Sequence, residues 1–438
     1  MALHSSSLWL DIVFFEDLYR WTIRVGLDSL GHISLQHKAT FTCLHRLLIL
    51  LVRISIATHS TNSARIAIAL STSNNSISLV TLNIANQPRS SVKMLSTKNF
   101  VATLSVASLA AQSFAAPTPA AAPQYSLVAD VPGDNFFDAW TAYSDDDPTH
   151  GFVNYQTMQD AADQALAAYT YDPTTQSNHA YIGVDRKNHA PNGRNSVRLI
   201  SRQKFDIGTL AVLDMVHAPT GPGTWGAYWF LGSGSQWPHA GEIDVFEQVH
   251  DTPHAATTLH TSPGCSVDNS SSLFQNTLKE TDCNAGEAAM GCSTDAYTGA
   301  QTAQRNLATA GDAFNQQGGG VYVMSWTHSG ISVWMFGRDS LPSDLAAGKP
   351  NPSSWTDKPL AVFGGQGCDF NEAFVAQNAI INITLCGDWA GKVWESSGMA
   401  EKTGADTCED FVANNPEAFT EAYFQIASFK VYSSSSGN

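Results

Sequence analysis

The sequence predicts an all-β fold built from many short antiparallel strands. Short segments with alternating or continuous apolar residues recur over its second half, and clusters of Gly, Pro and Gln separate them. Long helical patterns are scarce, and residues 157–168 form the one persuasive helical stretch near the start of this region. Short strands with this punctuation are typical of antiparallel sandwiches and barrels. The strands that we expect cover residues 196–201, 210–216, 320–326, 331–336, 380–385 and 424–432.

The N-terminal part contains a segment with the features of a secretory signal peptide. Lys98 precedes a mostly apolar run over 100–110, and small residues follow it up to Ala116. A positive region, an apolar region and a small-residue cleavage site are typical of signal peptides, which act at the start of a chain. We therefore expect residues 94–116 to be the signal peptide and 1–93 to be a spurious or disordered extension.

A membrane anchor within 41–57 is the alternative for the N-terminal extension. Arg46 and Arg53 interrupt its apolar run, which is far shorter than the roughly 20 residues that span a bilayer. The anchor is therefore disfavoured. Residues 117–128 are rich in Pro and Ala and are expected to be a linker. No repeat or comparable linker follows, so residues 129–435 are expected to form one large domain.

The charge of the chain excludes two classes of partner. Its formal net charge is −16 at pH 7. An acidic protein is repelled by nucleic acid and by anionic membrane surfaces, whereas a neutral polymer such as a polysaccharide carries no such penalty. We therefore expect no nucleic-acid and no membrane partner.

Cysteine usage indicates an oxidising compartment. Apart from Cys43 in the extension, the cysteines form no CxxC pair and have no metal-ligand spacing; they are Cys265, Cys283, Cys292, Cys368, Cys386 and Cys408. An even set of this kind predicts disulfides whose pairing the sequence does not decide. Asn269 and Asn382 stand in glycosylation sequons. A secreted, extracellular protein is expected, with association with a cell wall left open.

The candidate chemistry lies in the stretch Gly-Glu-Ile-Asp-Val-Phe-Glu that ends at Glu247. Side chains alternate between the two faces of a strand, so Glu242 and Asp244 point the same way and Glu247 points the other way. One extra residue between Asp244 and Glu247, a β-bulge, would bring all three acids to one face. Ile243 and one residue of the following Val-Phe pair would then pack into the core.

Two carboxyl groups roughly 5–5.5 Å apart are what a retaining glycosidase needs. In this interpretation Glu242 is the nucleophile and Glu247 is the acid/base, whose pKa its neighbours raise. Asp244 lies between them and assists by hydrogen bonding. A solvated acidic strand edge and a divalent-cation site are the alternatives that the spacing by itself leaves open.

Several blocks of sequence resemble glycoside hydrolase family 16, and specifically the fungal laminarinase-like endo-β-1,3(4)-glucanases. The central block is the most specific, and all of them occur in order over most of 135–435. The blocks are DDPTHGFVNY at 146–155, GRNSVRL at 193–199, GTWGAYW at 223–229, WPHAGEIDVFE at 237–247, TLHTSPGC at 258–265 and NITLCGDWAG at 382–391.

The resemblance implies a β-jelly-roll, a concanavalin A-like sandwich of two antiparallel sheets with an open cleft on its concave face. It implies the bulged strand and the same three acids as catalytic residues. It further implies that His260 lies beside the acids and that Arg194 and Asn154 are polar residues of the cleft. Gln248 departs from the family, in which Gly is common after the last acid, and this puts binding on the leaving-group side in doubt.

Aromatic residues are the other requirement of a glycan cleft, because the C–H faces of sugars stack on aromatic rings. The candidates are Trp237, which precedes the acids by five residues, and Trp225, Trp229 and Trp389. A core position is the alternative for each of them.

The expected function is hydrolysis of internal bonds in β-1,3- or mixed β-1,3/1,4-glucans by a monomer without a cofactor. A structural calcium ion is left open. One rival is a cell-wall transglycosylase of the same family, which the polar C-terminal residues 433–438 disfavour because a lipid anchor needs an apolar tail. The other is a non-catalytic glucan-binding sandwich, which would require the loss of an acid.

Overall fold

The computed structural model describes residues 125–268, 278–286, 289–294 and 307–434, together with the backbone of strands between Leu8 and Ala85. The chain divides into two compact units, Met1–Gln112 and Ser113–Asn438. The predicted signal peptide at 94–116 and residues 117–124 of the predicted linker lie outside the described residues. The linker prediction is wrong for residues 125–128, because they belong to strand β7 (Tyr125–Pro132), which pairs with the last strand of the chain.

The first unit contains two three-stranded antiparallel sheets. They are β1 (Leu8–Glu16), β2 (Tyr19–Leu27) and β3 (Ile33–Ala39), and β4 (Leu51–His59), β5 (Ser63–Ser71) and β6 (Ile77–Ala85). The expectation that residues 1–93 are an extension stays a prediction.

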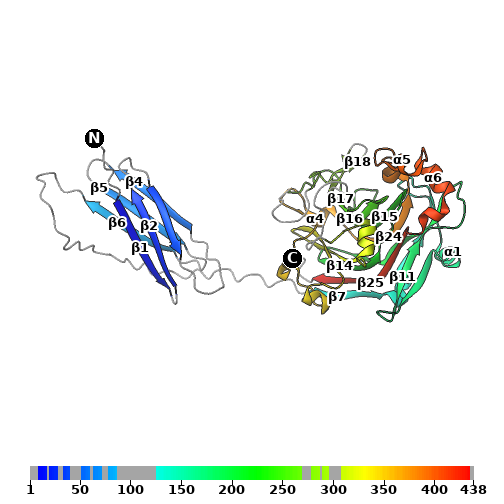
Figure 1. Ribbon diagram of the computed structural model, residues 1–438, viewed down its shortest axis with the longest axis horizontal. Helices are drawn as coiled ribbons and strands as arrows, with labels where there is room; N and C mark the ends of the chain where they lie inside the picture. The colour runs from blue at the N-terminus through cyan, green and yellow to red at the C-terminus, as the bar shows by residue number, and fades with distance from the viewer. Residues whose placement is uncertain are drawn as a thin grey trace, which may run out of the picture. The chain divides into compact units, whose positions relative to one another are not determined.

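The second unit is a sandwich of two large sheets (Figure 1). The seven-stranded sheet has the order β20 (Cys292–Ser293), β17 (Ala256–His260), β16 (Glu242–Val249), β15 (Thr224–Gly232), β24 (Gln377–Leu385), β13 (Arg198–Phe205) and β8 (Trp140–Tyr143). The eight-stranded sheet has the order β10 (Ala167–Asp172), β11 (Ser177–Gly183), β25 (Tyr423–Ser434), β14 (Thr209–His217), β21 (Gly320–Thr327), β22 (Gly330–Phe336) and β23 (Ala361–Gly364), with β7 (Tyr125–Pro132) paired to β25. All pairings within both sheets are antiparallel, and the predicted fold class is confirmed.

Short elements decorate the loops of the sandwich. Two small sheets pair β9 (Val153–Tyr155) with β12 (Arg194–Ser196) and β18 (Ala285–Gly286) with β19 (Ala289–Met290). The helices are α1 (Met158–Asp163), α2 (Gly311–Gln316), α3 (Ser343–Ala346), α4 (Phe370–Ala373), α5 (Met399–Thr403) and α6 (Cys408–Asn414). Short 3₁₀ segments are η1 (Gly133–Ala139), η2 (Pro352–Ser354) and η4 (Pro416–Phe419), and η3 (Gly387–Gly391) is a short π-helix.

The core lies between the two sheets and is rich in aromatic rings. Phe246 of β16 reaches Tyr322 of β21 with ring centroids 5.4 Å apart, and Tyr228 of β15 reaches Phe429 of β25 at 6.2 Å. Alternate residues of β15 and β16 are therefore fixed toward the core, because a one-residue shift would expose these rings. The remaining residues point to the outer face of the seven-stranded sheet.

The predicted helix at 157–168 is wrong beyond Asp163. Thr157 caps α1 by accepting a hydrogen bond from the Asp160 amide at 3.2 Å. Ala165 has a left-handed backbone with φ of 55°, which a helix cannot continue. Residues from Ala167 onward instead pair with β11, so tertiary pairing overrides the local helical pattern.

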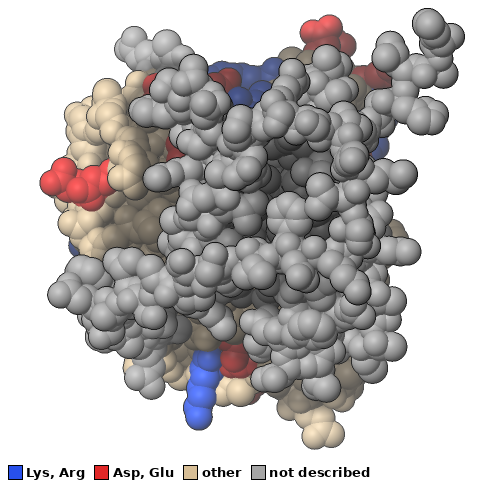
Figure 2. All heavy atoms as spheres, turned by 90° about the vertical axis from the view of Figure 1, so that its left-hand side faces the viewer, with Lys and Arg blue, Asp and Glu red and all other residues tan. Residues whose placement is uncertain are grey.

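Three disulfides confirm the oxidised state predicted for the cysteines. They join Cys265 to Cys368, Cys283 to Cys292 and Cys386 to Cys408. Within the described residues, no helix has the length and apolar character that crossing a bilayer requires. Both acidic and basic side chains are visible on the described surface in Figure 2.

Candidate active site

The strand β16 carries the three acids and is bulged where the sequence predicts. It pairs with β17 in register through Asp244 and again at Glu247, and the register shifts between these two residues. A shift also occurs against β15 on the other side. The carboxylates of Glu242, Asp244 and Glu247 therefore share the outer face. Val245 and Phe246 are both fully buried, so the expectation that only one of the pair enters the core is corrected: the bulge turns both inward.

The acids are largely withdrawn from water, and this dominates their electrostatics. Burial raises the pKa of Glu242 to about 8, and the charge of Asp244 adds to the shift. Burial likewise raises the pKa of Glu247 to about 8, again with Asp244 as the next cause. Burial also raises the pKa of Asp244 well above its ordinary range. The three groups therefore cannot all be ionised at neutral pH, and the cluster retains a proton.

Each glutamate accepts a hydrogen bond from an indole. Nε1 of Trp237 donates to Oε2 of Glu242 at 2.9 Å, and Nε1 of Trp225 donates to Oε1 of Glu247 at 2.9 Å. Against the effect of burial, each bond lowers the pKa of its glutamate. The two tryptophans therefore orient the carboxyl groups and favour their ionised forms.

His260 faces the acids from the neighbouring strand β17, where it pairs with Glu242. Its Nε2 lies 3.1 Å from Oδ2 of Asp244 and 3.8 Å from Oε1 of Glu242. A charged imidazole here lowers the pKa of both glutamates, although less than burial raises it. The structure thus places His260 where the resemblance implies, beside the acid cluster.

The tryptophans predicted to bind sugar differ in how they meet the surface. Trp237 is 48% exposed, so its ring is accessible to a ligand, and it lies beside the acids with its ring centroid 5.8 Å from that of His260. Trp225 and Trp389 are half-buried and meet edge to face at 5.7 Å. Trp229 lies on the same face but is buried, and its Nε1 donates to Oδ1 of Asn382 at 2.7 Å. Trp237 is therefore the best placed of the four for stacking.

Arg194 does not line this face, and that prediction is corrected. Its side chain is fully buried and donates to the carbonyl oxygens of Val412, Asp185 and Asn188. A guanidinium in the interior needs such acceptors, and here it ties three segments of backbone together. Asn154 is exposed, and its amide donates to the Gly193 carbonyl at 2.7 Å. Its contact with substrate stays a prediction.

Arg198, four residues after Arg194, is the arginine that reaches the outer face, and sequence reasoning missed it. Its guanidinium lies between the rings of Tyr143 and Trp229, 5.0 and 4.9 Å from their centroids. Its Nη1 is 3.9 Å from Oδ1 of Asp147, and its Nε is buried without a hydrogen-bond partner in the described part of the chain. Its position follows from the register of β13, in which Arg198 pairs with Asn382 on β24, and no local sequence pattern marks it.

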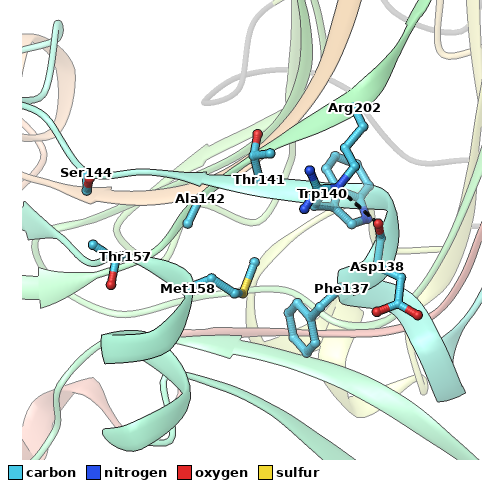
Figure 3. Close-up of a pocket in the computed structure, with 9 residues that line it drawn as sticks. All are labelled: Phe137, Asp138, Trp140, Thr141, Ala142, Ser144, Thr157, Met158 and Arg202. Atoms are coloured by element: carbon cyan, nitrogen blue, oxygen red, sulfur yellow. Dashed lines mark hydrogen bonds between the residues drawn. The ribbon is translucent and has the colours of Figure 1, made fainter.

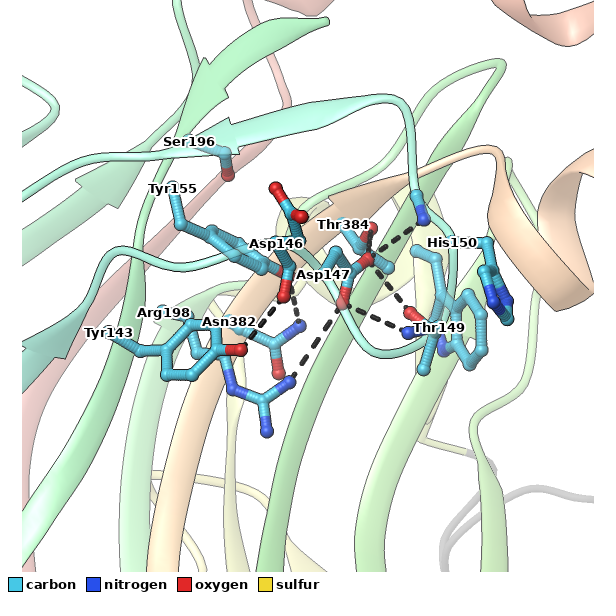
Figure 4. A network of polar contacts seen from close by, with 12 residues as sticks. Tyr143, Asp146, Asp147, Thr149, His150, Tyr155, Ser196, Arg198, Asn382 and Thr384 are labelled. Atoms are coloured by element: carbon cyan, nitrogen blue, oxygen red, sulfur yellow. Dashed lines mark hydrogen bonds and ion pairs between the residues drawn. The ribbon is translucent and has the colours of Figure 1, made fainter.

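Asp147 holds in place the loop of residues 144–151, which lies against Arg198. Figure 4 shows Tyr143, Arg198 and Asn382 converging on the loop of Asp146 and Asp147. Oδ2 of Asp147 accepts from Oγ1 of Thr384 at 2.6 Å and from the Gly151 amide at 3.1 Å. This nearly buried carboxylate therefore pins the loop to β24 beside the acids.

Asn382 belongs to the same network and is not a glycosylation site. It is 5% exposed, and its amide nitrogen donates to the Tyr155 hydroxyl at 3.1 Å. A glycan needs an accessible side chain, so the prediction from this sequon is wrong; Asn269 lies outside the described residues. Gln248 is also fully buried, with its Oε1 accepting from the Gly311 amide at 3.0 Å. This departure from the family therefore faces the interior and not the site.

Glu242, Asp244 and His260 could together hold a cation, since each offers an atom within 4.8 Å of the others. Calcium takes a shell of oxygen ligands, and an imidazole in the set does not suit it. This group therefore does not supply the structural calcium site, which stays a prediction.

A family model described as the XgeA-like catalytic GH16 domain matches residues 140–432, most of the described sandwich and all three acids. The chain belongs to glycoside hydrolase family 16. The bulge and the acid cluster described above lie within the residues that match this GH16 catalytic domain.

Named relatives of this GH16 chain are fungal. A probable glycosidase of Schizosaccharomyces pombe is 38% identical over 70% of this chain and 69% of its own length. The endo-1,3(4)-beta-glucanase xgeA of Emericella nidulans is 36% identical over 75% of this chain and 50% of its own length. The chain thus spans about half the length of xgeA and of a similar probable endo-1,3(4)-beta-glucanase from Aspergillus clavatus.

Solved GH16 structures are similar to about 70% of this chain. Laminarinase 16A from Phanerochaete chrysosporium, with 6-O-glucosyl-laminaritriose in donor and acceptor sites, is 35% identical, with a TM-score of 0.62 over 70% of this chain and 99% of that chain. An elongating GH family 16 β-1,3-glucosyltransferase is 34% identical, with a TM-score of 0.62 over 70% of this chain and 100% of that chain. The same GH16 fold therefore serves both hydrolysis and transfer among these neighbours.

Proposed function

We propose that this GH16 chain is a retaining endo-β-glucanase that cleaves internal bonds of β-1,3- or mixed β-1,3/1,4-glucans. The observation that carries the proposal is the bulge of β16, which sets two indole-bonded glutamates on one face with Asp244 between them. Two carboxyl groups that flank the scissile bond, one as nucleophile and the other as acid, are what double displacement needs.

The first step forms a covalent glycosyl-enzyme. An oxygen of ionised Glu242 attacks the anomeric carbon, the bond from that carbon to the bridging oxygen breaks, and Glu247 gives its proton to the departing glucan. The raised pKa of Glu247, about 8, keeps this proton available at neutral pH. The Trp237 hydrogen bond and the nearby His260 both favour the ionised Glu242 that the attack requires.

The second step releases the sugar. Ionised Glu247 takes a proton from water, the water oxygen bonds to the anomeric carbon, and the ester bond to Glu242 breaks. Asp244 lies between the two glutamates in both steps: in its ionised form it raises the pKa of each of them and so opposes the ionisation of both at once. Two inversions leave the anomeric configuration unchanged.

Glucan specificity rests on the surrounding face. Trp237 offers an exposed ring for a sugar face, and the buried Arg198 has an Nε without a partner in the described residues beside the network of Asn382 and Asp147. The names of relatives and neighbours, endo-1,3(4)-beta-glucanase and laminarinase, support β-1,3-containing glucans as substrates.

The test of the two roles is azide rescue of Glu242→Ala and Glu247→Ala on a β-laminaribioside with a good leaving group. Without the nucleophile, azide attacks directly and gives the α-azide. Without the acid/base, the glycosyl-enzyme still forms and azide opens it to the β-azide. The opposite stereochemistry in the two variants would reverse the assignment, and hydrolysis of laminarin by Glu242→Ala without azide would refute the mechanism.

Transfer between glucan chains is the second candidate, because one neighbour of this chain is an elongating β-1,3-glucosyltransferase. Transfer replaces water by a sugar hydroxyl in the second step and uses the same acids. Products from laminariheptaose separate the two: shorter oligosaccharides indicate hydrolysis, and longer ones indicate elongation.

Secretion is part of the proposal. The three disulfides support an oxidising compartment, in which a monomer would meet its polysaccharide substrate. Mass spectrometry of culture medium from an expressing fungus tests this, since an intact intracellular chain with free thiols would contradict it.

A further inference from the structure

A hollow lies at the open edge of the sandwich, apart from the acid cluster. There β8 ends the seven-stranded sheet and β10 ends the eight-stranded sheet, while β16 with the acids lies in the interior of its sheet. The hollow has a volume of about 660 Å³, and its walls come from η1, β8, the start of α1 and Arg202 of β13. Figure 3 shows Phe137 and Met158 side by side on one side of β8. A volume of this size matches that of small-molecule sites, about 300–1,000 Å³.

Exposed aromatic rings continue the hollow onto β10. Tyr169 pairs with the fully buried Ala180, so its ring points to the core-facing side of the sheet. It is nevertheless 44% exposed, and Tyr171, two residues along on the same side, is 64% exposed. The Phe137 ring, which lines the hollow, meets Tyr169 edge to face at 5.2 Å and so connects this tyrosine to it. Among the described residues, Trp237 at the acids is the other strongly exposed aromatic ring.

The wall of the hollow also offers polar groups. Trp140 is fully buried, and its indole N–H reaches no acceptor among the residues the structure describes. A buried donor without an acceptor is rare in folded proteins, because it loses the water that would otherwise bind it. Arg202 lies beside it, with its Nε donating to the Asp138 carbonyl at 3.1 Å (Figure 3). Thr141, Ser144 and Thr157 line the same space.

We propose that this edge is a second, non-catalytic binding site for a β-glucan chain. Two tyrosines at alternate positions of a strand stand about 7 Å apart, which lets neighbouring sugars each stack on one ring. Arg202 supplies donors for sugar hydroxyls, and a wall with one cation, Arg202, and one anion, Asp138, beside its rings carries no net charge and suits a neutral ligand. The identity of the ligand rests on the proposed function, whereas the site does not use the acids.

The experiment compares full chains that carry Glu242→Gln, which removes cleavage, with and without Tyr169→Ser and Tyr171→Ser. Retention on insoluble β-1,3-glucan is measured by sedimentation. We expect the double tyrosine change to weaken retention about tenfold, since loss of two stacking rings removes about 1.4 kcal/mol or more. Tyr171→Ser by itself tests the site without touching the contact with Phe137. Leu127→Ser with Val128→Ser removes comparable exposed apolar surface on β7 and should leave retention unchanged.

Activity separates this proposal from the proposed function. With Glu242 intact, the tyrosine variants should lose activity on the insoluble glucan and keep it on a short soluble laminarioligosaccharide. Unchanged retention in both tyrosine variants would overturn the second site, and so would equal loss in the β7 control. If the wild type cleaves nothing yet retention still depends on the tyrosines, the site stands and the proposed hydrolysis fails.

Discussion

Replacing Glu247 by Gln should stabilise the fold, and by an amount that grows with pH. The replacement keeps the shape and an oxygen that accepts from Trp225 Nε1, but it removes a group that the fold holds in its protonated form. Burial, followed by the charge of Asp244, raises the pKa of Glu247 from 4.5 to about 8. Between these two values the unfolded chain has released a proton that the folded chain still binds, so wild-type stability falls as pH rises.

The size of the effect follows from that interval. Below pH 4.5 both states are protonated and the two proteins should be about equally stable. Each unit of pH above it costs the wild type about 1.4 kcal/mol, so the difference is about 2 kcal/mol at pH 6 and has an upper bound of about 5 kcal/mol above pH 8.

Urea denaturation at a series of pH values from 4 to 8.5, with disulfides intact, measures this difference. Glu395→Gln is the matched control, since Glu395 is exposed and should show no comparable trend. A Glu247→Gln protein that is no more stable than the wild type at pH 8 would refute the reasoning that burial holds the proton on Glu247.

Three further predictions follow from the same contacts. Trp237→Phe removes the hydrogen-bond donor to Glu242 and should raise the pKa of that glutamate, which moves the acid limb of the pH profile of kcat/KM to higher pH. Trp225→Phe should likewise raise the pKa of Glu247 and move the alkaline limb to higher pH. If each variant moved the other limb instead, the roles of the two glutamates would be reversed. Arg198→Lys keeps the charge but loses the planar stack between Tyr143 and Trp229, so kcat/KM on laminarin should fall about tenfold with a matching loss of about 1–2 kcal/mol; an unchanged value would remove Arg198 from the binding face. The double change Cys386→Ala with Cys408→Ala removes a disulfide that joins residues 22 apart in the chain, and it should lower the free energy of unfolding in urea by about 3 kcal/mol. KM should also rise, because η3 next to this bond carries Trp389. An unchanged free energy of unfolding would show that the disulfide does not restrain the unfolded chain.

Local sequence patterns were enough to predict the fold class and the strand that contains the three acids. Apolar residues at alternate positions define which face of β15 and β16 enters the core, and that rule holds wherever a sheet buries one side. Because the side-chain period of a strand is two, Glu242, Asp244 and Glu247 can share one face only if the strand is bulged, and the pairing of β16 with β17 has this bulge. The helix at 157–168 failed beyond Asp163 because pairing with β11 outweighs local propensity.

What the sequence by itself determined about this GH16 domain is therefore the position of its acid cluster: three acids in one strand, the bulge that brings them to one face, and a tryptophan five residues before them. The resemblance to the family added the histidine beside them. The tertiary structure decided which of two nearby arginines faces outward. Arg194 donates hydrogen bonds to backbone carbonyls in the interior, whereas Arg198 pairs in register with Asn382 on the outer face. The tertiary structure also decided the cysteine pairing and the exposed tyrosines at the edge of β10. These depend on contacts between residues far apart in the chain, which no local period encodes.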